Sequence, residues 1–139
     1  MRFRVAASIF SIISLAGCGA INVEAEIRNS PEGKSVASYV TAALKGDPLD
    51  SHYGTCSGES DKETAGGMWK EARGSHPDLT DFTFDSSTTS PNSSSINLVI
   101  ASKQGGEGYK IVVHTALEDG KWVICSAREG HVTIDADPL

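Results

Sequence analysis

Residues 109–128 read YKIVVHTALEDGKWVICSAR, and this stretch decides the fold. Apolar and polar side chains alternate over residues 109–117, and a second strand-like run covers residues 121–128. Asp119-Gly120 stands between the two runs. This dipeptide is a strong hairpin signal, because both of its residues tolerate the positive φ angles that a tight turn requires. The stretch therefore predicts two antiparallel strands joined by a short turn.

Two further strand-like runs precede this hairpin in the chain. Their alternating apolar positions are Phe82, Phe84, Ile96, Leu98 and Ile100. Residues 86–95 between them are rich in Ser and Thr, and we expect a hairpin loop there. The glycine-rich residues 105–108 predict a turn before the third strand. Together the four runs predict an antiparallel β-meander.

Helical periodicity is confined to the part of the chain before the strands. Residues 34–45 carry apolar side chains three and four positions apart, and Gly46 follows as a C-cap. A second helix is predicted from Ser60 to Gly74, where Ser60-Asp61-Lys62-Glu63 has the capping-box pattern. The expected fold class is α+β, with two N-terminal helices packed on a curved four-stranded antiparallel meander.

The N-terminus has the organisation of an export signal. Arg2 and Arg4 precede an apolar run over residues 5–16, which is too short to span a bilayer as a helix. The run ends in Leu15-Ala16-Gly17-Cys18. This sequence closely resembles the bacterial lipobox, and the resemblance implies cleavage before Cys18 and acylation of its thiol. An ordinary secretory signal is the alternative.

The chain is accordingly divided into three parts. Residues 1–17 are expected to be the lipoprotein signal peptide, residues 18–31 the lipidated cysteine and a flexible tether, and residues 32–139 a single α+β domain. The formal net charge of the whole chain is −6, and removal of the signal peptide makes it more negative. An acidic surface repels phosphate backbones, so nucleic acid is excluded as a partner.

Two cysteines remain once Cys18 is acylated. Cys56 and Cys125 would meet an oxidising compartment after export, and we expect a disulfide between them. Closing a loop of about 70 residues corresponds to roughly 4 kcal/mol of stabilisation in the chain-entropy model. A nucleophilic thiol near His52 is the less favoured interpretation, since nothing specifies an orienting third group.

The run Gly120-Lys121-Trp122-Val123-Ile124-Cys125, together with Lys45-Gly46-Asp47 at the end of the first predicted helix, resembles the nuclear transport factor 2-like lipoproteins of bacteria, especially of actinobacteria. The resemblance covers about residues 32–129. It implies a helix-covered curved sheet and a late cysteine that pairs with one near the helices. It implies no activity. A smaller cystatin-like roll is the alternative fold.

Three aromatic residues are candidates for a pocket or an interface, although an ordinary core would also use them: Trp69, Tyr109 and Trp122. Trp122 and Cys125 are three residues apart, so they point to opposite faces of the sheet unless a bulge intervenes. His114 alternates with the apolar residues of its strand and is expected to face solvent. No histidine spacing suggests a metal site, and no cofactor is expected.

We therefore expect a non-enzymatic lipoprotein at the outer face of the cell membrane. Acyl chains on Cys18 would hold it there, and it would act through contact with an envelope protein, in regulation or in exclusion of a second phage. The alternative function is a carrier of a small molecule or lipid in a cavity between helices and sheet. A third hypothesis, an enzyme of the polyketide-cyclase type, requires His114 to face inward.

Overall fold

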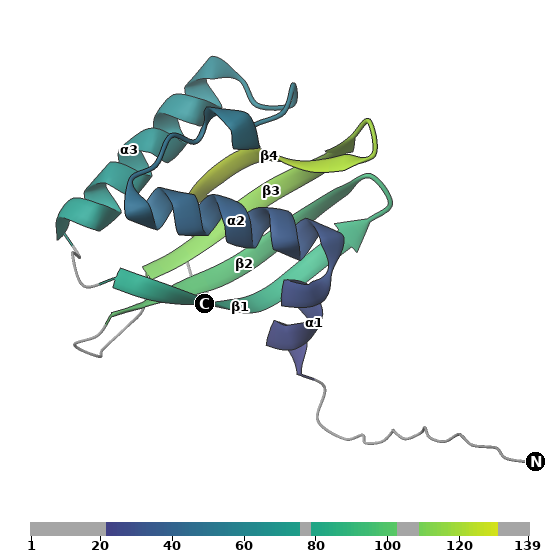
Figure 1. The fold of residues 1–139 in the computed structure, drawn as a ribbon, viewed down its shortest axis with the longest axis horizontal. Coiled ribbons are helices and arrows are strands. Elements are labelled where there is room, and N and C mark those ends of the chain that lie inside the picture. The colour runs from purple at the N-terminus through teal and green to yellow at the C-terminus, as the bar shows by residue number, and fades with distance from the viewer. Residues whose placement is uncertain (1–21, 76–78, 103–108, 131–139) are drawn as a thin grey trace, which may run out of the picture.

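The computed structural model describes residues 22–75, 79–102 and 109–130 (Figure 1). Its α-helices are α1 (Val23–Asn29), α2 (Pro31–Lys45) and α3 (Glu59–Ser75), and a short 3-10 helix, η2, covers Asp50–His52. The strands are β1 (Leu79–Ser90), β2 (Ser93–Ser102), β3 (Tyr109–Glu118) and β4 (Lys121–Glu129). They form one antiparallel sheet in the order β1-β2-β3-β4. The predicted α+β class and the meander are confirmed.

The number of helices differs from the prediction. Residues 23–29, which we assigned to the tether, form α1. Asn22 caps this helix by accepting a hydrogen bond from the N–H of Ala25, and Ile27 is buried in the core. Seven residues are too few to show a helical period. The helix is held by long-range contacts instead, so the folded body begins before Glu32.

Helix α2 begins earlier than predicted and ends where expected. Ser30 is its N-cap and accepts a hydrogen bond from the N–H of Gly33, while Pro31 occupies the first helical turn. Gly46 has a φ of 81°, which confirms it as the left-handed C-cap. The helix buries one face, whose core residues are Val36, Tyr39, Val40 and Ala43.

Helix α3 is confirmed, but its N-terminal cap is not the predicted one. The helix begins at Glu59, and the carboxylate of Asp61 accepts a hydrogen bond from the N–H of Gly58. Ser60 and Glu63 therefore stand one or more positions inside the helix, where a capping box cannot form. Gly66 and Gly67 lie on its exposed side.

The Ser- and Thr-rich residues 86–95 form strand, and the loop predicted for them is wrong. The turn consists of Pro91 and Asn92 alone, and Thr88 pairs with Ser95 across the hairpin. The apolar alternation ends here because both faces carry polar side chains. Most of them are exposed, and the buried Ser94 shares a hydrogen bond with the Thr115 hydroxyl. Asp119 and Gly120 have φ angles of 53° and 77°, which confirms the second hairpin turn. The glycine-rich turn predicted at 105–108 lies outside the described residues.

The helices cover one face of the sheet, and the core lies between the two layers (Figure 1). Strand β4 contains a bulge, because Thr115 pairs with Ile124 while His114 pairs with Ser126. Cys125 is the extra residue. As a result Ile124 and Ala127 both reach the core, although they are three positions apart.

Candidate interaction site between α2 and β1

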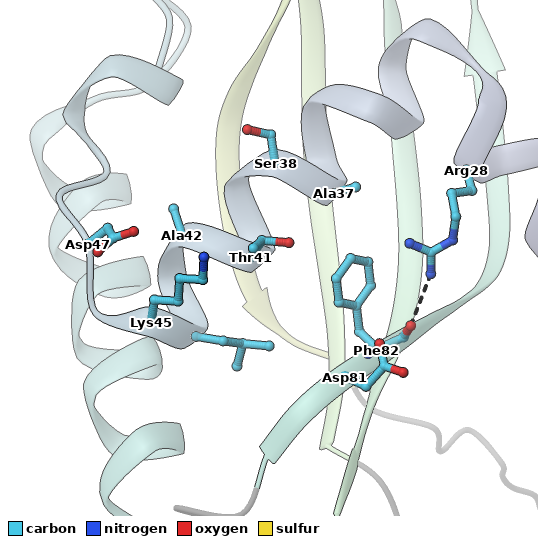
Figure 2. A pocket seen from close by; sticks show the side chains of 10 residues that line it. Arg28, Ala37, Ser38, Thr41, Ala42, Lys45, Asp47, Asp81 and Phe82 are labelled. Carbon is cyan, nitrogen blue, oxygen red and sulfur yellow. Dashed lines mark hydrogen bonds between the residues drawn. The ribbon is translucent and has the colours of Figure 1, made fainter.

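A groove of about 690 Å³ runs between α2 and the edge strand β1 (Figure 2). Its apolar lining residues are buried or half-buried: Ala37, Ala42, Leu44 and Phe82. Its polar lining residues are more exposed and carry charges of both signs: Arg28, Ser38, Thr41, Lys45, Asp47 and Asp81. The groove is thus an apolar strip with a charged rim, a composition typical of binding surfaces.

Helix α1 closes one end of this groove by binding the edge of β1. Arg28 donates from Nη2 to the carbonyl oxygen of Phe82 at 3.0 Å, the bond drawn in Figure 2. Glu24 accepts from the N–H of Phe84 at 3.1 Å. The N–H of Phe82 donates to Oδ1 of Asp81 at 2.8 Å. Side chains therefore satisfy backbone groups that a further strand would otherwise pair.

The two charged residues of α1 also bind each other. Glu24 and Arg28 form an ion pair with an N–O distance of 2.5 Å. The hydrogen bond from Arg28, and then that from the N–H of Phe84, lower the pKa of Glu24 below its ordinary value. The Arg28 guanidinium also lies 4.9 Å from the ring centroid of Phe82 and 5.1 Å from that of Phe84. Arg28 therefore combines an ion pair with Glu24 in α1 and cation–π contacts with the two phenylalanine rings of β1.

The three aromatic candidates lie in different environments. Trp69 is 0% exposed in the core between α3 and the sheet. Tyr109 is half-buried and packs against the core, and burial raises the pKa of its hydroxyl. Trp122 is half-buried beside α2 and lines a second groove of about 380 Å³. In the described part of the chain, the groove lined by Trp122 has neither Trp69 nor Tyr109 in its lining.

Aromatic side chains of α2 and α3 form part of the core between helices and sheet. The Nε1–H of Trp69 donates to the hydroxyl of Tyr39, which shares a second hydrogen bond with the hydroxyl of Tyr53, each at 2.9 Å. Burial strongly raises the pKa of Tyr39, so the hydroxyl stays protonated. This network occupies the part of the interior in which a carrier would need a cavity.

Cys56 and Cys125 lie at disulfide distance, with sulfur atoms 2.06 Å and Cα atoms 5.1 Å apart. The carboxylate of Glu118 holds the same loop. It accepts hydrogen bonds of 3.0 Å from the N–H groups of Thr55 and Cys56, and one from the Thr55 hydroxyl. These bonds lower the pKa of Glu118, with the N–H of Thr55 as the largest cause.

His114 is exposed on the sheet face that points away from the helices. The enzymatic alternative required an inward His114, and we do not propose it. Within the described part of the chain, no cluster of His, Cys, Asp or Glu side chains could hold a metal ion. No helix among the same residues is long and apolar enough to cross a bilayer. Cys18 lies outside the described residues.

The residues that line the groove were not predicted as a site. They come from α1, α2 and β1, and no local motif connects segments so far apart in the chain. One signal was present, since Glu24 and Arg28 are spaced four residues apart as in a helical ion pair. A comparison with protein-family models finds no match to this chain, and a comparison with curated proteins finds none either.

Proposed function

We propose that this protein is a lipid-anchored envelope lipoprotein that acts by binding another protein in the groove between α2 and β1. The observation that carries the proposal is the groove itself, an apolar strip with a charged rim beside a sheet edge. Such a surface suits a protein segment, because apolar burial supplies affinity while charges on the rim select the partner. Binding there would serve either to regulate an envelope enzyme or to exclude a second phage.

The anchor in this proposal is Cys18, for which the lipobox resemblance of residues 15–18 is the support. Two or three acyl chains hold a protein stably in a bilayer, whereas one chain binds marginally. The domain itself then needs no membrane-binding surface. The partner of the acyl chains is the membrane, and the partner of the groove is an envelope protein.

We infer a nuclear transport factor 2-like or cystatin-like roll as the finer fold. Support comes from the order of elements, with α2 and α3 before a four-stranded meander and packed on one face of it. The second function, a carrier, has less support, because Tyr39 and Trp69 occupy the interior between the layers.

The anchor is tested by intact mass measurement of the exported chain. The mass expected is that of residues 18–139 plus diacylglycerol and an amide-linked acyl chain. The variant Cys18→Ala should keep its signal peptide and carry no lipid. A wild-type chain with a free Cys18 thiol would refute the anchored model.

The contact is tested with a photoreactive amino acid at Thr41, an exposed residue of the groove. Thr83, exposed on the opposite face of the sheet, is the matched control position. We expect one defined crosslinked protein from position 41 in living cells and none from position 83. The crosslink should disappear when Ala42→Arg fills the groove. Equal crosslinking from both positions would exclude the groove as the binding surface.

A further inference from the structure

A second groove lies at Trp122, between α2 and β4. It shares Ser38 with the groove proposed above, and its other lining residues are different. Its volume is about 380 Å³, within the range of small-ligand sites. Three segments supply its polar and aromatic lining: Lys34 and Ser38 of α2, Ser51 and His52 of η2, and Lys121 and Trp122 of β4.

The charge of this groove is opposite to that of the whole protein. Lys34 and Lys121 line it and no carboxylate does, although the chain has a net charge of −6. Other grooves of the described surface contain carboxylates, such as Asp81, Glu118 and Asp85. Lys121 also lines the neighbouring groove with Glu118, but among the described residues neither lysine forms an ion pair. The charge pattern favours an anionic ligand.

Contacts within the protein hold the walls of the groove in place before any ligand binds. Ser35 donates from Oγ to the carbonyl oxygen of Trp122 at 3.0 Å and so ties α2 to β4. The ring of His52 packs edge-on against that of the buried Tyr39, with centroids 5.8 Å apart. A ligand that enters this groove therefore meets a preorganised site.

We propose that this groove binds an acidic saccharide. The half-buried Trp122 ring offers an apolar surface for the C–H face of a sugar ring, and Lys34 and Lys121 offer two ammonium groups for its acid group. The hydroxyls of Ser38 and Ser51 match sugar hydroxyls. An acidic peptide is less well matched, because Ile124 is the one aliphatic side chain in the lining.

The test is a titration of the full exported chain in nonionic micelles with digalacturonate, and with digalactose as the neutral counterpart. The two tryptophan indole N–H signals are followed by NMR, since Trp69 is fully buried and serves as an internal reference. We expect digalacturonate to shift the Trp122 signal with a Kd on the order of 1 mM at low salt, because the charges are exposed. Digalactose should bind more weakly.

The variant Lys34→Ala/Lys121→Ala should weaken binding by about five- to tenfold, since exposed ion pairs contribute up to roughly fivefold each. Lys110→Ala/Arg128→Ala removes the same charge from exposed positions on the opposite face and should leave the Kd unchanged. Equal loss in both variants would overturn the site, as would equal binding of the two sugars or no shift of the Trp122 signal. Tighter binding of hexaglutamate than of digalacturonate would overturn the saccharide class.

Discussion

The indole Nε1–H of Trp69 in α3 donates a hydrogen bond to the hydroxyl of Tyr39 in α2, at 2.9 Å. Both side chains are 0% exposed. Their rings pack edge-on with centroids 5.8 Å apart, and Tyr53 packs on Tyr39 in the same manner at 5.6 Å. A single hydroxyl thus connects the two long helices to the loop that precedes the cystine.

Replacing Tyr39 by Phe should destabilise the fold by about 1–3 kcal/mol, because the buried indole N–H of Trp69 would lose its acceptor. The free energy of unfolding in urea is the measurement. Tyr53→Phe is the control, since it leaves the bond between Tyr39 and Trp69 intact and should cost about 0.5–1.5 kcal/mol. Equal losses in the two variants would contradict this assignment.

Removing the cystine in the variant Cys56→Ala/Cys125→Ala should lower the free energy of unfolding by about 4 kcal/mol, because the bridge closes a long loop in the unfolded chain. The two residues are separated by 69 positions. Denaturant unfolding with and without a reductant is the measurement. The reductant should destabilise the wild type and leave the variant unchanged, and a wild type insensitive to reductant would contradict the bridge.

Gly54 and Gly67 should respond oppositely to alanine. A Cβ at Gly54 would stand 2.2 Å from Cγ2 of Val123 and 2.7 Å from Oε1 of Glu118, so we expect a loss of about 1–3 kcal/mol from overpacking. A Cβ at Gly67 meets no atom within 4 Å, and alanine should add about 1 kcal/mol through helix propensity. Thermal unfolding should give a lower melting temperature for Gly54→Ala and a higher one for Gly67→Ala than for the wild type. A stabilised Gly54→Ala would contradict the close packing.

The lowered pKa of Glu24 makes its contribution to stability depend on pH. The folded-state pKa lies below the unfolded one, so the contribution is complete above about pH 4.3, the ordinary value for glutamate, and is lost as the pH falls through the folded-state pKa. In urea unfolding, the Glu24→Gln variant should lose less stability than the wild type when the pH is lowered below that value. Glu26→Gln, which removes the same charge from an exposed position of the same helix, is the control variant.

Strands with one buried face were predictable from the sequence, because their apolar residues alternate. Strand β3 follows this pattern, as do β1 at Phe82 and Phe84 and β2 at Ile96 and Leu98. Strand β4 does not, because its bulge interrupts the alternation, and the turn before it was the signal. The Ser- and Thr-rich half of the first hairpin could not be recognised, since both of its faces are polar. Only the pairing with its neighbour makes it a strand.

Helix α1 and the groove escaped prediction for a related reason. Arg28 and Phe82 are 54 positions apart, and their contact exists only once the chain has folded. The bulge at Cys125 was anticipated as one solution to the spacing of Trp122 and Cys125. The register of β4 shows that it occurs.

Both outer strands of the sheet are partly covered. Glu24 and Arg28 bind the backbone of β1, and Tyr53 forms a bridge to Ile124 in β4, followed by a 3.1 Å hydrogen bond from the N–H of Gly54 to the carbonyl oxygen of Ile124. Lipid anchoring, as proposed, would confine neighbouring copies to a two-dimensional layer with their sheets at similar heights. Covered edges would let such a layer become crowded without strands of adjacent molecules joining into fibres.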